Sequence, residues 1–291
     1  MNKPTPSFLT ALSNQKPLQI AGTINAYSAL LAERAGFNAI YLSGAGVANA
    51  SFGIPDLGFT TLEQVAEDAR RICHVSNLPL LVDIDTAWDD PALTINTMID
   101  VGVSAVHMED QVSMKRCGHR DGKKLVTCDE MQNRIKIAVT ARNSNSMIIM
   151  ARTDACSVEG FDAAIDRSLA YIDAGADMIF AEAFESLDQY KFFCEKMSVP
   201  VLANMTEFGK TPYYSLEDFN TVGVDMVLYP LSAFRAMSAA TLQVYNTIKH
   251  EGSQQSCLDN MQTRAELYDV LNYEKFEKEM DDQFHKSGES E

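Results

Sequence analysis

Eight short apolar runs, separated by longer segments of helical periodicity, constrain the fold of this 291-residue chain more than any other feature. The runs are almost continuously hydrophobic, as are parallel strands buried on both faces. Apolar residues recur at helical spacing between them, as from Leu62 to Ile72 and from Ala163 to Ile172. We predict strands at Gln19–Thr23, Ala39–Ser43, Leu80–Asp85, Ser104–Glu109, Met147–Thr153, Asp177–Glu182, Pro200–Met205 and Asp225–Tyr229.

A glycine-containing junction recurs four times, at residues 35–40, 101–106, 174–179 and 222–227. In each case Gly follows a helical stretch and precedes a strand, which suits the left-handed position that ends a helix. Eight strands in such an alternation favour an α/β fold of the closed (β/α)8 type. An open doubly wound sheet is the alternative, but the sequence has neither of the standard glycine-rich phosphate loops that would support it.

The chain divides by composition into two parts. Residues 1–240 are predicted to form the barrel, and residues 241–291 a C-terminal helical segment. Within that segment we expect two helices, a linker and a frayed acidic tail, at Ala239–His250, Asn260–Leu271, Glu251–Ser256 and Lys275–Glu291 respectively.

Charge and cysteine content exclude several classes of protein. The net charge of −16, from 24 basic and 40 acidic residues, disfavours binding to nucleic acid through the general surface. The sequence has no run of 18 apolar residues and no apolar region of a secretory signal near its start, so we expect neither a membrane partner nor export. Six cysteines without C-x-x-C spacing indicate reduced thiols and a cytoplasmic protein.

Polar or charged residues end almost every predicted strand, on the side where barrel enzymes carry their active sites. Asp83 and Asp85 lie two apart on one strand, so their carboxylates share a face and repel each other unless a cation lies between them. Oxygen ligands suit Mg²⁺ or Mn²⁺. Glu109 and Asp110 are candidates for water-mediated contact with that ion. Helix capping is the alternative role for Asp89 or Asp90, though not for the earlier pair.

The segment Lys115–Arg120 places Cys117 and His119 among basic side chains in an otherwise acidic protein. Nearby cations favour the thiolate and can hold a polyanion. A solvated basic loop with an incidental cysteine is the alternative. We interpret three other cysteines, Cys73, Cys156 and Cys194, as packing or surface residues. His107, within a predicted strand, is interpreted as a core histidine.

The run Lys115-Arg116-Cys117-Gly118-His119 resembles the K-[KR]-C-G-H signature of the isocitrate lyase family, within the phosphoenolpyruvate mutase superfamily. The resemblance covers nearly the whole chain and is strongest to the short bacterial branch that acts on 2-methylisocitrate. Ala45 is a departure, since the family usually has a second Gly there. Further motifs are in register at residues 41–44, 55–58, 83–85, 109–111, 151–154 and 229–235.

The resemblance implies a (β/α)8 barrel whose last helix is exchanged between the subunits of a homotetramer. It implies Mg²⁺ held by Asp83 and Asp85, with Glu109 near through water. It counts Cys117, Tyr41, His119 and Lys115 as catalytic, with Cys117 as the acid and Tyr41 as a candidate base. It implies that the substrate carboxylates meet Ser43, Gly44, Ala45, Gly118, Arg152, Asn204, Thr206 and Arg235. It also implies that Glu182 lies beside the substrate and that Arg264 adds a charge from the C-terminal segment.

The implied activity is cleavage of 2-methylisocitrate to pyruvate and succinate in the methylcitrate cycle of propionate catabolism. Phe180 and Leu228 match positions where the resemblance places the pocket for the substrate methyl group; ordinary packing is the alternative. Isocitrate lyase is the more similar alternative activity within the family, but its chains are usually much longer. Phosphoenolpyruvate mutases and oxaloacetate decarboxylases lack the cysteine signature, and a catalytically silent barrel would be expected to lose one of Asp83, Asp85, Cys117 and Arg152.

Overall fold

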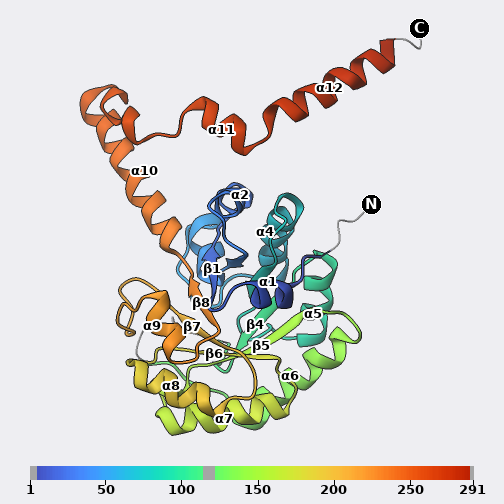
Figure 1. The fold of residues 1–291 in the computed structure, drawn as a ribbon, viewed down its shortest axis with the longest axis vertical. Coiled ribbons are helices and arrows are strands. Elements are labelled where there is room, and N and C mark those ends of the chain that lie inside the picture. Colours follow the sequence, from blue (N-terminus) through green and yellow to red (C-terminus); the bar gives the residue numbers. More distant parts are fainter. Residues whose placement is uncertain (1–4, 114–121, 289–291) are drawn as a thin grey trace. The chain divides into compact units, whose positions relative to one another are not determined.

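A computed structural model describes residues 5–113 and 122–288 of the chain. Eight parallel strands close into a barrel in which each strand pairs with its neighbours in sequence and β8 pairs with β1 (Figure 1). The closed barrel is therefore confirmed, and all eight strands fall within two residues of the predicted bounds. They are β1 Leu18–Gly22, β2 Ala39–Leu42, β3 Leu80–Asp83, β4 Ala105–Glu109, β5 Ile148–Thr153, β6 Met178–Ala181, β7 Val201–Asn204 and β8 Met226–Tyr229.

Alternate residues of each strand point into the barrel and out toward the helices. The inward rows form one buried apolar cluster, which includes Leu18, Leu81, Met150 and Leu202. The outward rows form a second and larger cluster with the helices. This alternation decides which residues at the strand ends can reach the barrel axis.

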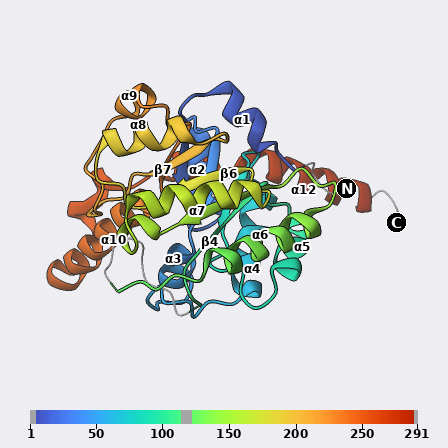
Figure 2. The same ribbon diagram turned by 90° about the horizontal axis from the view of Figure 1, so that it is seen from below.

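Helices cover the outside of the barrel, each in contact with the next around the ring (Figures 1 and 2). Their apolar faces supply the outer cluster, and the predicted stripes at Leu62 and Ala163 lie on α4 and α7. The ring comprises α2 Ala26–Arg34, α4 Leu62–Val75, α5 Pro91–Asp100, α6 Cys128–Arg142, α7 Phe161–Asp173, α8 Leu187–Lys196 and α9 Leu216–Thr221.

Four glycines end helices before strands, as the recurring junction predicted. Gly36, Gly102, Gly175 and Gly223 all have φ between 82° and 105°, a region in which side chains other than hydrogen are strained. Helix α1 (Phe8–Asn14), which precedes β1, packs Phe8 into the inner cluster. Short helices follow two of the strand ends: α3 Gly44–Gly46 and η1 Val47–Ser51 come after β2, and η2 Ala155–Ser157 comes after β5.

The chain separates into two compact units, Met1–Phe234 and Arg235–Glu291. Helix α10 (Ser232–Glu251) has no buried residue, and it contains the predicted Ala239–His250 helix. The second unit continues with η3 Gln255–Asn260, α11 Arg264–Val270 and α12 Tyr273–Gly288. The frayed tail expected at Lys275–Glu291 is wrong as far as residue 288, because Phe276, Met280 and Phe284 recur every fourth residue, on one face of α12. Among the described residues, no helix is long and apolar enough to span a membrane.

Candidate active site

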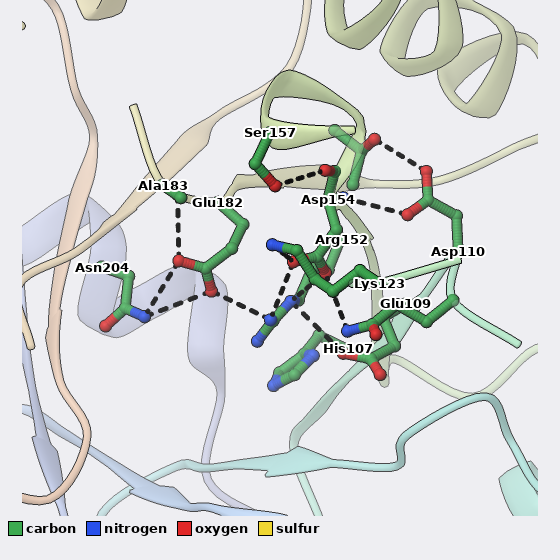
Figure 3. A network of polar contacts seen from close by, with 12 residues as sticks. His107, Glu109, Asp110, Lys123, Arg152, Asp154, Ser157, Glu182, Ala183 and Asn204 are labelled. Carbon is green, nitrogen blue, oxygen red and sulfur yellow. Dashed lines mark hydrogen bonds and ion pairs between the residues drawn. The ribbon is translucent and has the colours of Figure 1, made fainter. Parts of the chain in front are cut away.

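The inward rows of six consecutive strands end in polar or aromatic side chains at one end of the barrel. Each continues its row beyond an apolar residue of the inner cluster, as Arg152 follows Met150 and Glu182 follows Phe180. All are less than a tenth exposed. This group consists of Tyr41, Asp83, His107, Glu109, Arg152, Glu182 and Asn204, five of which appear in Figure 3.

Asp83 and Asp85 converge beneath the backbone of Gly44. A Cβ atom at Gly44 would lie 3.1 Å from Asp83 Oδ2 and 3.2 Å from Asp85 Oδ1, so both carboxylates approach one point. The amide of Gly44 donates to Asp83 Oδ2 at 3.1 Å, and the amide of Asp85 donates to Asp83 Oδ1 at 3.1 Å. Strand alternation is not the reason for the convergence: β3 ends at Asp83, and Asp85 lies in a left-handed turn with φ 49°.

The loop after β3 is strained. Ala87 (φ 63°) and Trp88 (φ 49°) also adopt left-handed conformations, which cost side-chain-bearing residues about 1–3 kcal/mol each. Packing holds the loop in place, since the Trp88 indole donates to the carbonyl of Thr60 at 2.8 Å. Asp90 caps α5 by accepting from the amide of Leu93 at 3.0 Å, which confirms the capping role considered for it.

The oxygen donors of Asp83 and Asp85 fit a divalent cation. No group of three or more His, Cys, Asp or Glu suited to a metal is found within residues 5–113 and 122–288. Mg²⁺ commonly takes only one or two carboxylates and completes its shell with water and substrate. Two converging carboxylates, with water and substrate oxygens at the other coordination positions, are therefore compatible with such an ion.

Tyr41 and His107 form a pair beside Asp83. The Tyr41 hydroxyl lies 2.9 Å from Nε2 of His107 and 3.5 Å from Asp83 Oδ2, and the two rings stack with centroids 5.7 Å apart. His107 Nε2 is also 3.7 Å from Asp83 Oδ1. Interpreting His107 as a core histidine was incomplete: it is fully buried, but its position two residues before Glu109 places it in the inward row.

Arg152 lies at the centre of the acidic residues (Figure 3). Its Nε atom is 3.0 Å from Asp154 Oδ2 and 3.4 Å from Glu109 Oε2, and its Nη2 atom is 3.0 Å from Glu182 Oε2. Burial alone would lower the pKa of Arg152, but these three carboxylates raise it well above its ordinary value. The guanidinium carbon also lies 5.0 Å from the ring centre of Phe180. Arg152 therefore stays charged at every pH at which the protein is folded.

Glu182 and Asn204 extend the group toward β7. The Asn204 amide donates to Glu182 Oε1 at 3.4 Å and to Oε2 at 3.3 Å, and the amide of Ala183 donates to Glu182 Oε1 at 2.9 Å. Ala183 has φ 59°, so this strand end is strained as well. The arrangement fixes Glu182 against Arg152.

Asp110 takes no part in this group, contrary to the suggestion that it contacts the ion through water. Adjacent strand residues point to opposite faces, so Asp110 turns outward where Glu109 turns inward (Figure 3). It accepts from Thr153 Oγ1 at 2.7 Å and from the hydroxyl of Tyr171 at 2.9 Å. Burial raises its pKa, and the nearby charge of Asp154 adds to the rise.

Other predicted residues have varied positions. Ser43, Gly44 and Thr206 are buried at strand ends, while Ala45 is half-buried in α3. Phe180 and Leu228 are fully buried in the inner cluster, and Leu228 pairs in register with Asn204. Arg235 and Arg264 belong to the second unit. Lys115, Cys117, Gly118 and His119 lie outside the described residues.

The three cysteines interpreted as packing or surface residues, Cys73, Cys156 and Cys194, are half-buried. Burial raises the pKa of Cys156, and burial also raises the pKa of Cys194 to about 12. Cys73 packs against the outer cluster. These positions agree with a packing role.

The sequence matches the phosphoenolpyruvate phosphomutase family over residues 8–249. It is 56% identical over 280 residues to a 2-methylisocitrate lyase of Shewanella oneidensis, covering 95% of this chain and 96% of that protein. It is 50% identical over 291 residues to a 2-methylisocitrate lyase of Escherichia coli, covering 99% of this chain and 98% of that protein.

Solved structures agree with this relationship. A 2,3-dimethylmalate lyase superposes with a TM-score of 0.86 at 34% identity, covering 92% of this chain and 91% of that one. An oxaloacetate acetylhydrolase bound to 3,3-difluorooxalacetate superposes with a TM-score of 0.90 at 28% identity, covering 98% of this chain and 99% of that one. The chain thus belongs to the phosphoenolpyruvate phosphomutase family, in the superfamily that also contains the isocitrate lyases.

Proposed function

We propose that this chain is a 2-methylisocitrate lyase, which cleaves the C2–C3 bond of its substrate to give pyruvate and succinate in the methylcitrate cycle. Its near full-length identity of 50–56% to proteins of that name supports the assignment. The observation that carries the chemistry is the convergence of Asp83 and Asp85 beside the Tyr41–His107 pair and Arg152.

The substrate carries three carboxylates, so the site needs cations that are not fully neutralised. Arg152 uses Nε and Nη2 for its own carboxylate neighbours, and no described residue accepts a hydrogen bond from its Nη1 atom. A guanidinium carries five donors, so those on Nη1 remain for a substrate carboxylate. We propose the loop after β2, at Ser43 and Ala45, as a second place for a carboxylate, since the amide of Gly44 already donates to Asp83.

Cleavage begins with removal of the C2 hydroxyl proton. Tyr41 is the proposed base, and His107 within 2.9 Å is placed to share the proton with it. The electrons of the O–H bond form the C2 carbonyl of pyruvate, and those of the C2–C3 bond pass to C3. The charge at C3 is delocalised into its carboxylate, where nearby cations stabilise it. A proton from the Cys117 thiol to C3 then completes succinate.

Asp83 and Asp85 are the residues proposed to hold the cation, with Glu109 near through water, and we propose Mg²⁺ as the ion. With the ion bound, the site gains Lewis-acid polarisation of the C2 oxygen and its carboxylate. Cys117 must be protonated before cleavage, so a fully ionised thiolate would be inactive in this direction. The basic neighbours Lys115 and His119 are proposed to stabilise the charge rather than to ionise the thiol.

A turnover assay with 2-methylisocitrate and isocitrate side by side tests the assignment. A pocket for one methyl group typically discriminates by about 10- to 200-fold. We expect kcat/KM to favour 2-methylisocitrate, with pyruvate and succinate as products and only slow glyoxylate formation from isocitrate. Equal or faster cleavage of isocitrate would instead identify an isocitrate lyase.

We also propose that the enzyme is a cytoplasmic homotetramer in which residues 241–291 pack on a neighbouring subunit. The second unit exposes large apolar side chains, which include Leu242 (61%), Tyr245 (66%) and Phe284 (69%). Exposed apolar surface on this scale is typical of a protein interface. Light scattering of the full chain measures the subunit number, and a monomer at micromolar concentration would contradict the proposal. Arg235 and Arg264 are proposed to contact substrate carboxylates in that assembly.

A further inference from the structure

Asp154 is a buried carboxylate that the proposed reaction does not use, yet three side chains converge on it (Figure 3). Its Oδ1 atom accepts from Lys123 Nζ at 2.8 Å. Its Oδ2 atom accepts from Arg152 Nε at 3.0 Å and from Gln111 Nε2 at 3.4 Å. Both Lys123 and Asp154 are fully shielded from solvent, so these are charge-assisted bonds in a region of low dielectric constant.

The partners of Asp154 come from both sides of one chain segment. Gln111 precedes residues 112–122, which include Cys117, and Lys123 follows them. The two flanks are joined by backbone hydrogen bonds: the amide of Val112 donates to the carbonyl of Lys124 at 3.0 Å, and that of Val126 donates to the carbonyl of Asp110 at 2.9 Å. One carboxylate therefore links both flanks of this segment to Arg152.

The position of Asp154 is itself fixed from outside the site. Its amide donates to Asp110 Oδ1 at 2.9 Å, and Asp110 is held in turn by Thr153 and Tyr171. Asp154 also separates two buried cations, Lys123 and Arg152, which would repel each other without it. Its geometry therefore depends on the scaffold and not on bound substrate.

We propose that Asp154 is a positioning residue, which sets the plane of the Arg152 guanidinium and ties it to both flanks of the segment that carries Cys117. The kinetic consequence rests on the proposed lyase function, whereas the link itself rests on the hydrogen bonds around Asp154. Substrate would thus meet an arginine whose orientation relative to the flanks is already set. Preorganisation of this kind matters because a displacement of about 1 Å can reduce the rate about 10²-fold.

Asp154→Asn tests the kinetic part, since it keeps the size of the side chain and removes its charge. Removing a negative charge beside Arg152 strengthens the attraction for an anionic substrate, so KM should stay the same or fall. Loss of orientation should lower kcat by about 10²-fold. The control is Asp177→Asn, which breaks the Asp177–Arg142 ion pair at the opposite end of the barrel and should leave kcat unchanged. A raised KM with normal kcat, or equal kcat in both variants, would overturn the proposal.

Amide hydrogen exchange tests the link without any turnover. In Asp154→Asn the amides of Val112 and Val126 should exchange about 10- to 100-fold faster, the range expected for loss of a charge-assisted bond. Asp177→Asn should leave both rates unchanged. Unaltered exchange in Asp154→Asn would contradict the proposal. Absence of lyase activity in the wild-type protein would count against the proposed function alone, because exchange still decides the role of Asp154.

Lys123→Met keeps the proposal testable if Asp154→Asn does not fold. Met has a side chain of similar length to Lys but no charge, so the variant removes the Lys123 cation and leaves the bond between Asp154 and Arg152 in place. Exchange at Val112 and Val126 should again be faster than in the wild-type protein, while kcat should fall by less than the about 10²-fold expected when the orientation of Arg152 is lost. Unchanged exchange in Lys123→Met would show that Lys123 does not hold the flank.

Discussion

The hydroxyl of Tyr41 lies 2.9 Å from Nε2 of His107, with Asp83 beside both residues. This contact joins the proposed base to the proposed metal site, among the side chains that end the inward strand rows. Neither residue is accessible to bulk solvent, so a proton that Tyr41 accepts can be shared with His107 before it reaches water.

Tyr41→Phe should reduce kcat by about 10²- to 10⁴-fold, the usual contribution of one positioned acid–base group. The ring remains to fill the inner cluster, so the free energy of unfolding should change by only about 1 kcal/mol. Tyr190→Phe is the matched control, because Tyr190 is equally buried but lies among the aromatic rings of α8 and α9. Steady-state kinetics and thermal unfolding measure both variants; normal turnover by Tyr41→Phe would exclude it as the base.

Asp85→Asn should abolish metal-dependent turnover while the barrel stays folded. Asn is chosen because it tolerates the left-handed conformation of Asp85. Chelation of the wild-type enzyme should have the same effect, and Mg²⁺ or Mn²⁺ should restore activity. Asp90→Ala is the contrasting variant in the same loop: loss of its cap should cost about 0.5–2 kcal/mol of stability and leave metal activation intact. Full activity after exhaustive chelation would refute the metal assignment.

Cys117→Ser should lose at least about 10²-fold in kcat, and a thiol alkylating agent should inactivate the wild-type enzyme. Succinate with Mg²⁺ should protect against inactivation. Burial raises the pKa of Cys194 to about 12, so Cys194 carries almost no thiolate at pH 8 and should react only after unfolding. Peptide mapping after alkylation identifies the modified thiol. Inactivation that tracks modification of another cysteine would assign the role elsewhere.

Asp110 should make stability depend on pH in a defined direction. Burial raises its pKa above the value of the unfolded chain, so the folded state binds its proton more tightly. Its contribution to the free energy of unfolding therefore declines as pH rises from about 3.8 through the raised value. Urea denaturation of wild type and Asp110→Asn between pH 4 and pH 7 measures this difference. A wild-type advantage that grows with pH would show the sign to be wrong.

Leu228→Ala should reduce the preference for 2-methylisocitrate over isocitrate, by up to about tenfold. Leu228 pairs with Asn204, which places it at the level of the site, whereas Met226 lies one inward position deeper in the barrel. Met226→Ala should cost a similar 2–5 kcal/mol or so of stability but keep the substrate ratio. The ratio of kcat/KM values for the two substrates is the measurement. Equal ratios in both variants would favour a packing role for Leu228.

The sequence predicted the barrel well because strands buried on both faces are continuous apolar runs that end at polar residues. The sequence predicted less well whether a side chain at a strand end points into the barrel or out toward the helices. Glu109 and Asp110 look alike in sequence, and only strand alternation separates the inward residue from the outward one. The same alternation, applied from Glu109 back to His107, could have identified His107 as a residue of the site.

Long-range contacts explain what the sequence could not show. Asp154 and Lys123 are 31 positions apart, and nothing local in either segment indicates that they meet. The acidic, polar composition of the tail predicts fraying, whereas the spacing of Phe276, Met280 and Phe284 carries the helical signal. The left-handed turn at Asp85 likewise has no glycine to indicate it.

Gly44 also limits how this barrel can be redesigned. A methyl group there would press against the carboxylates of both Asp83 and Asp85, at 3.1 and 3.2 Å. The loop after β2 and the loop after β3 therefore act as one module, although 39 positions separate Gly44 from Asp83. The loop after β3 alone would carry both proposed metal ligands without the amide that donates to Asp83, and the loop after β2 alone would carry neither ligand. Grafts from this scaffold therefore need to carry both loops together.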